Sequence, residues 1–321
     1  YTFKEIILIL ENFNPTFLNI SGFKKLDGSQ IIRENITYII NTLKSCVSKN
    51  ETKKNIIHIF NSNFFLDKKK IDNLPIGLFG DFYSHELSFN LINKNIFKNL
   101  ERVVTNCNLK IKKILLKSFV TGACISDNNR DLDTFFKIKI GKKNSKIFYF
   151  ENNSLKYEQY FEFGSNIIIR DISKITSLRE ETIETILHKT ELNRNLLNEE
   201  LIDKIFFNQD AYRKIKKRLL YDISFARIEE ILDKIIFKNI NTYYHNKISN
   251  VIFLEIEDQT HLNYFKEVFQ EILKSNGSNF NFLDNFSDEN MLKTANKLVH
   301  FGWKKEAIPI THFQKSIIAR F

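Results

Sequence analysis

The alternation of apolar and polar positions predicts short strands interleaved with helices. Runs of strand length, rich in aliphatic and aromatic residues, occur at 4–10, 17–23, 55–60 and 109–116. Between these strands, apolar residues recur at helical spacing over 27–47 and 93–107. The first two strands flank a turn at 12–15, so they are expected to pair about this turn.

Residues 131–164 form the segment around which the rest of the chain is organised. An aromatic and aliphatic run that starts at Phe135, a turn at 141–144 and a returning run to Phe150 predict a hairpin. A second turn follows, and a third extended segment ends at Gly164. Three consecutive strands are therefore expected to lead into a helix.

After Gly164, helical and extended patterns alternate. Helices are expected at 177–189, 198–205, 211–244, 262–272 and from Ser287 onward. Strands are expected at 248–254 and 280–282. This alternation favours an α/β fold.

Length and composition narrow the class of protein. A chain of 321 residues with 43% hydrophobic residues is long enough for two domains and is not disordered. No apolar run approaches the ~18 residues that a membrane-spanning helix needs. Three widely spaced cysteines, without a CxxC pair or a secretory leader, are expected to be buried thiols in a reducing cytoplasm: Cys46, Cys107 and Cys124.

Charge and motifs exclude several functions. The formal net charge is +10, but heavy use of Ile, Lys, Asn and Phe is typical of an A+T-rich genome, so the charge is weak evidence for nucleic-acid binding. No module of stacking aromatics and lysines is visible. The chain also lacks a P-loop, an HExxH motif and a nucleophile elbow, so no constellation for hydrolysis emerges.

The order of elements and several turns resemble the bacterial cell-division protein FtsA, an actin-like family. In that family a D-I-G-G-G-T-x-D turn is followed by a strand and then by a G-G-x-x-(V/I)-T-x-D-I-A helix start. Residues 139–146 stand on the turn, and 164–172 stand on the helix start with one glycine and the pair Asp171-Ile172. Residues 75–80, PIGLFG, resemble the family's N-P-V-G-L-x-G, and 294–303, TANKLVHFGW, resemble its A-x-G-L-L-x-Y-G.

The resemblance implies a two-lobed actin-like (ribonuclease-H-like) α/β fold with mixed sheets flanked by helices. It places the first lobe at 1–126, with a shortened inserted segment at about 65–92. The second lobe would span 127–303 and include a helical subdomain at about 175–247. A C-terminal tail, 304–321, would follow. Thr121-Gly122-Ala123 is a candidate hinge before the lobe boundary, or a site of close packing.

The aligned loop departs from the nucleotide-binding chemistry of the family. The degenerate nucleotide loop consists of Lys139, Gly141, Lys142, Lys143, Asn144 and Lys146. Lysines replace both acidic residues and two of the glycines whose backbone N–H groups cradle phosphates. At about 4 Å and an effective dielectric near 20, each charge pair is worth roughly 4 kcal/mol, so a divalent cation would be repelled strongly.

We therefore expect no ATP hydrolysis, no catalytic residue, no metal and no cofactor, although ATP binding is left open. The family's L-T-G-G-A/G turn, against which adenosine packs, is likewise replaced by Glu257 and Asp258. The alternative for the four lysines is a solvated hairpin tip or an anion-binding loop.

Two further candidate sites rest on the resemblance. A basic cluster stands where the family binds the C-terminal tail of the tubulin-like protein FtsZ: Arg213, Lys214, Lys216, Lys217 and Arg218. The alternative is a solvated helix end. The tail resembles the basic amphipathic helix with which FtsA contacts anionic membranes, through Phe313, Lys315, Ile317, Ile318, Arg320 and Phe321. The alternative is an ordinary frayed terminus.

The predicted function is that of an FtsA-type adaptor at the division septum. It would hold FtsZ polymers on the cytoplasmic face of the inner membrane, self-associate, and bind no nucleic acid. The alternatives are a pilus-type actin-like assembly protein and a nucleotide-dependent actin-like ATPase.

Overall fold

The computed structural model describes residues 3–11, 13–129, 132–190, 192, 195, 197, 199–207, 210–242, 251–257, 259–283 and 287–307. The chain forms two compact units. Unit 1 comprises Tyr1–Thr134, Phe150–Glu158 and Phe286–Phe321, and unit 2 comprises Phe135–Tyr149 and Gln159–Asn285. These units do not coincide with the predicted lobes, because three stretches of the predicted second lobe belong with unit 1: 127–134, 150–158 and the residues from Phe286 onward.

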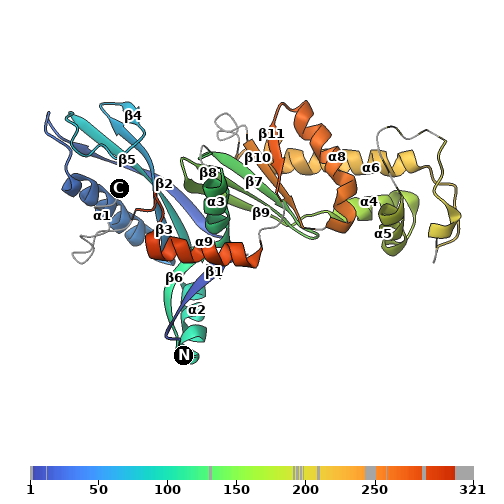
Figure 1. Cartoon of the computed structure of the whole chain (residues 1–321), viewed down its shortest axis with the longest axis horizontal. Coiled ribbons are helices and arrows are strands. Elements are labelled where there is room, and N and C mark those ends of the chain that lie inside the picture. The colour runs from blue at the N-terminus through green and yellow to red at the C-terminus, as the bar shows by residue number, and fades with distance from the viewer. Residues whose placement is uncertain are drawn as a thin grey trace. The chain divides into compact units, whose positions relative to one another are not determined.

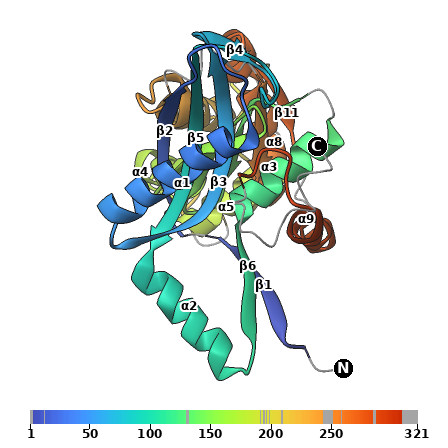
Figure 2. The same cartoon turned by 90° about the vertical axis from the view of Figure 1, so that its left-hand side faces the viewer.

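Unit 1 contains a two-stranded parallel sheet of β1 (Glu5–Leu10) and β6 (Lys110–Leu116). Helix α2 (Lys94–Asn106) runs alongside this pair (Figure 2). The expected pairing of 4–10 with 17–23 is wrong, although both segments are strands. β1 is aliphatic at consecutive positions, which is typical of a parallel strand rather than of a hairpin with alternating faces.

A second sheet of unit 1 has the order β2-β5-β3-β4. Its antiparallel strands are β2 (Thr16–Lys25), β5 (Phe82–Asn93), β3 (Lys54–Leu66) and β4 (Lys69–Ile71). Helix α1 (Arg33–Asn50) packs on one face through Ile36, Ile39, Ile40, Leu43 and Val47. The segment at 65–92, expected to be a shortened insertion, thus includes β4 and β5.

Helix α1 starts later than the sequence pattern predicts. Asp27 and Gly28 have positive φ values of 50° and 78°, and residues 26–31 exchange backbone hydrogen bonds with 77–81. The predicted start at Asp27 is therefore a turn. Part of the PIGLFG segment takes part in this exchange, and its Gly77 also has a positive φ of 91°.

Two further helices of unit 1 are α3 (Lys117–Asn128) and α9 (Asp288–Phe301). The candidate hinge at 121–123 lies within α3 and is buried, and a Cβ on Gly122 would come within 2.4 Å of the Phe150 ring. The packing interpretation is therefore confirmed. Helix α9 packs against α3, and Ser287 caps it as predicted by accepting a hydrogen bond from the Asn290 N–H at 3.3 Å.

The cysteines divide between surface and interior. Cys124 is buried in α3, as expected, whereas Cys46 and Cys107 are exposed. The expectation of three buried thiols is wrong for these two, because Cys46 lies on the polar side of α1 and Cys107 follows the last turn of α2.

Unit 2 is built around a mixed sheet with the order β11-β10-β7-β8-β9 (Figure 1). The three predicted central strands are β7 (Phe135–Ile140), β8 (Ser145–Glu151) and β9 (Ser154–Phe161), and the ends of β8 and β9 around their turn belong to unit 1. β7 pairs in parallel with β10 (Val251–Ile256), which pairs in parallel with β11 (Asn279–Phe282).

Four helices of unit 2 pack against one another: α4 (Asn166–Thr176), α5 (Glu180–Lys189), α6 (Lys217–Leu232) and α8 (Gln259–Ser275). A π-helical turn, Asp233–Phe237, continues α6, and a short 3-10 turn spans Lys204–Phe206. The predicted helix at 211–244 is thus shorter, because 211–216 is not helical and Lys216 bridges to Leu201. Across the described ranges, no helix is both long enough and apolar enough to cross a membrane.

Candidate functional site

The loop that follows β7 is packed tightly against the start of α4. The Gly141 N–H donates to the Asn144 carbonyl at 2.8 Å, which closes the turn. A Cβ on Gly164 would come within 2.1 Å of the Gly141 carbonyl oxygen and 2.8 Å of the Asn144 nitrogen. Gly164 is therefore required for the loop to approach α4 this closely.

Carbonyl groups of the loop accept hydrogen bonds from the first N–H groups of α4. The Ser165 N–H donates to the Gly141 carbonyl at 2.9 Å, and the Asn166 N–H donates to the Lys142 carbonyl at 3.0 Å. N–H groups at a helix N-terminus are the ones that commonly bind phosphate. Here the protein's own backbone acceptors already satisfy two of them.

The carboxyl ends of β7 and β10 carry four alternating charges, which we call the charge ladder: Lys137, Lys139, Glu255 and Glu257. The strands are in parallel register with Lys139 opposite Glu255. The Lys139 Nζ lies 2.5 Å from Glu257 Oε1 and 3.7 Å from Glu255 Oε1. Lys137 forms an ion pair with Glu255, and both side chains are buried. Each lysine of the charge ladder thus faces a carboxylate.

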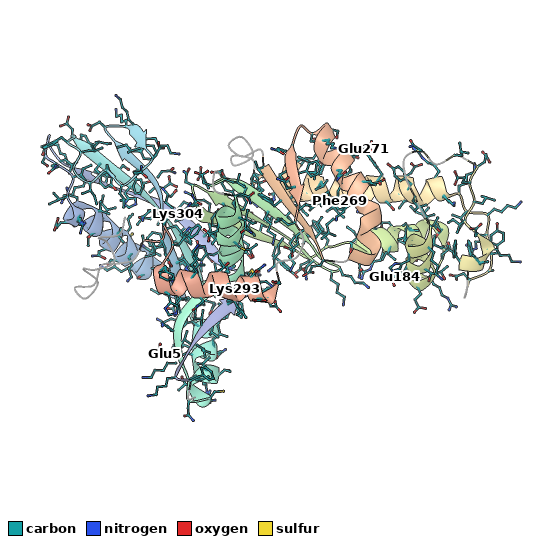
Figure 3. All side chains as sticks on the ribbon, in the orientation of Figure 1. Glu5, Glu184, Phe269, Glu271, Lys293 and Lys304 are labelled. Atoms are coloured by element: carbon teal, nitrogen blue, oxygen red, sulfur yellow. The ribbon has the colours of Figure 1, made fainter. Side chains whose placement is uncertain are left out.

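The other residues of the predicted loop are less enclosed. Lys142 lies 3.5 Å from Glu184 of α5, a residue labelled in Figure 3, and both side chains are partly exposed. The Lys146 ammonium lies 5.9 Å from the centre of the Tyr160 ring. Lys143 is exposed. The fold therefore brings the predicted loop residues together, but only Lys139 belongs to the charge ladder.

These residues do not fit a magnesium nucleotide. The acidic positions that would organise a metal are lysines, and the Glu257 carboxylate lies so close to Gly141 that a Cβ there would be 2.5 Å from Glu257 Oε2. Among the residues that the structure describes, no group of three or more His, Cys, Asp or Glu side chains could hold a metal ion.

Sequence reasoning missed two residues of this site, Lys137 and Glu255. The signal was present, because Lys-x-Lys in β7 and Glu-x-Glu in β10 put each pair on one face of its strand. Only the pairing of β7 with β10, more than a hundred residues later in the chain, shows that the two pairs face each other.

The basic cluster of the helical region is mostly engaged with local acceptors. Lys216 and Lys217 lie 3.3 Å from carboxylates of Glu199 and Glu200, and Arg218 donates to Asp222 at 2.9 Å. The Arg213 guanidinium donates to the Thr176 carbonyl at 3.2 Å. Lys214 is exposed. The cluster therefore presents less positive charge than five cations suggest.

The predicted membrane contact falls on residues 308–321 and lies outside the described residues. This applies to Phe313, Lys315, Ile317, Ile318, Arg320 and Phe321, and these positions stay a prediction. Asp258 also lies outside the described residues.

Comparison with known proteins shows distant sequence similarity to FtsA. The chain is 22% identical over 230 residues to FtsA of Buchnera aphidicola subsp. Acyrthosiphon pisum, which covers 71% of this chain and 54% of that protein. It is 24% identical over 220 residues to FtsA of Neisseria meningitidis serogroup B, which covers 67% of this chain and 52% of that protein. The chain therefore spans about half the length of these relatives. No protein-family model matches it.

Solved structures with similar folds include a PilM–PilN type IV pilus biogenesis complex, with a TM-score of 0.47 and 8% identity over 92% of this chain and 77% of that chain. MreB5 of Spiroplasma citri bound to AMPPNP gives a TM-score of 0.38 and 14% identity over 65% of each chain. The chain has an actin-like, two-lobed α/β fold with mixed sheets and flanking helices, as predicted, and it is a distant homologue of FtsA.

Proposed function

We propose that this chain acts as an FtsA-type adaptor that holds FtsZ polymers at the cytoplasmic face of the inner membrane during division, without hydrolysing ATP. The observation that carries the proposal is the similarity to FtsA over 230 residues, which is 71% of the chain. The proposed partners are the FtsZ C-terminal tail, an anionic membrane surface and further copies of the chain.

The chemistry of the charge ladder supports the non-hydrolytic part of the proposal. A lysine at each acidic position of the loop removes the groups that would bind the metal and orient the attacking water. The Lys139 ammonium, 2.5 Å from Glu257, also leaves that carboxylate paired rather than available as a metal ligand.

The surface around the basic cluster supports a docking site for an acidic and apolar peptide tail. Large apolar side chains lie exposed on the same region of unit 2: Leu201, Ile205, Tyr212 and Leu219. Ion pairs with Glu199 and Glu200 reduce the net charge of the cluster. Electrostatic attraction is therefore expected to raise the association rate of the peptide only modestly, and apolar contacts are expected to supply most of its affinity.

Binding of a fluorescent FtsZ C-terminal peptide from the same organism, measured at two salt concentrations, tests the proposal. Saturable binding is expected, with an association rate that falls with salt and that becomes less salt-sensitive in the K216E/K217E variant. The exposed pair Lys293 and Glu289 supplies a control, because K293E reverses a charge on unit 1, whereas the cluster belongs to unit 2. An absence of binding up to high micromolar peptide would contradict the proposal and favour a pilus-type assembly protein.

A further inference from the structure

We propose that the charge ladder replaces the nucleotide as the element that ties the phosphate-loop position to the neighbouring strand. This inference rests on the non-hydrolytic part of the proposed function and adds a role for the altered residues. Lys139 and Glu257 each replace a residue of a nucleotide motif, and the two replacements form one ion pair.

The two exchanged residues depend on each other. The Glu257 carboxylate lies against Gly141, in space that a side chain at position 141 would fill. From there it reaches the Lys139 ammonium at 2.5 Å, and the Glu257 N–H donates to the Ile140 carbonyl at 2.9 Å. Either charge without the other would be left beside a strand end with fewer partners.

The charge ladder and the Gly141 turn together join three elements: β7, the end of β10 and the start of α4. Lys137 and Lys139 belong to β7, Glu255 belongs to β10, and Glu257 follows the last residue of β10. The Gly141 turn extends the same strand end to α4 through the Ser165 N–H. The backbone hydrogen bonds and the four charges therefore connect β7, β10 and α4 directly.

Burial determines how much the ladder contributes. The Lys137 and Glu255 side chains are 5% and 8% exposed, whereas those of Lys139 and Glu257 are 22% and 45% exposed. The inner pair is therefore dry, and the outer pair is partly screened by water. A test on the outer pair measures coupling without leaving a fully buried charge unpaired.

A double-mutant cycle with neutral isosteres tests the inference on the full chain. In urea unfolding, K139M and E257Q are each expected to lower the folding equilibrium constant about twofold to fivefold, because the pair is partly exposed. The double variant is expected to lower it no more than K139M alone, because Glu257 has then already lost the Lys139 ammonium, whereas Lys139 in E257Q still lies 3.7 Å from Glu255. In the control pair, the Lys142 ammonium is 52% exposed and lies 3.5 Å from Glu184, a longer and more solvated contact, so K142M and E184Q are expected to add independently, within about twofold.

A second measurement tests whether the wild-type chain binds nucleotide. Titration with a fluorescent ATP analogue and Mg²⁺ is expected to give no saturable binding up to millimolar concentration, and ATP is expected to leave the thermal midpoint unchanged. Additive effects of K139M and E257Q, or saturable binding of the analogue by the wild-type chain, would overturn the inference. Neither result depends on the FtsZ peptide, so this failure is distinguishable from a failure of the adaptor proposal.

Discussion

His85 makes the stability of unit 1 sensitive to acid. The residue lies on β5 beneath α1, with 0% of its surface exposed and its ring 4.8 Å from the Phe64 ring. Neither of its ring nitrogens has a hydrogen-bond partner among the described residues. Burial lowers the pKa of His85 to about 3, and this cost outweighs the opposing attraction of Glu86.

The sign and size of the effect follow from this pKa. In the folded protein His85 stays neutral down to about pH 3, whereas in the unfolded chain it takes up a proton near pH 6.5. Stability is therefore lost as the pH falls from about 6.5 toward 3. Each pH unit in this window is worth about 1.4 kcal/mol, so the loss at pH 5 is about 2 kcal/mol.

Urea unfolding between pH 7 and pH 4 measures this loss. The wild-type chain is expected to lose stability with a slope steeper by about one proton than the H85F variant, in which no group titrates at this position. H300Q is the matched control, because His300 is an exposed histidine of the same unit. Equal slopes for the wild type and H85F would refute the reasoning, since the proton uptake would then arise elsewhere.

Three further substitutions test packing and pairing by their shifts in the urea or thermal midpoint. G164A is expected to cost about 2 kcal/mol or more, because its Cβ would lie 2.1 Å from the Gly141 carbonyl oxygen; an unchanged midpoint would show that the loop can move away. E306Q is expected to cost about 3 kcal/mol, because the buried Glu306 carboxylate lies 2.7 Å from the Lys113 ammonium; a smaller cost in the E306Q/K113M pair would confirm their coupling. W303F is expected to cost about 1 kcal/mol through the loss of a 2.7 Å hydrogen bond from the indole to a backbone carbonyl, and a neutral result would show that water replaces it.

Local patterns predicted the elements better than their partners. The turns at 141–144 and 151–154 fixed the order of β7, β8 and β9, because each turn carries its own glycine or asparagine signals. The period of two shows which residues share a face but not which strand lies beside them. For this reason β1 was assigned to β2, whereas its partner is β6, about a hundred residues later.

The candidate site was predicted in part for the same reason. The exchange of acids and glycines for Lys139, Lys142, Lys143 and Lys146 was visible in the chain, and so was Glu257 in place of a glycine turn. That these residues form ion pairs with one another could not be predicted without the register of β7 with β10, which places Lys139 opposite Glu255. The sequence predicts the basic cluster on a helix, but Arg213, Lys214 and Lys216 precede α6, and Lys216 bridges back to Leu201.

Residues 287–307 belong to unit 1, although all of unit 2 precedes them in the chain. The Ala307 N–H donates to the Ile59 carbonyl at 2.7 Å, and the Trp303 indole donates to the Asn153 carbonyl at 2.7 Å. A ribosome therefore completes all of unit 2 before it supplies the last residues of unit 1. Until then, the Ile59 carbonyl of strand β3 lacks its hydrogen bond from Ala307. During this interval, a chaperone or another copy of the chain can bind the unpaired backbone of β3.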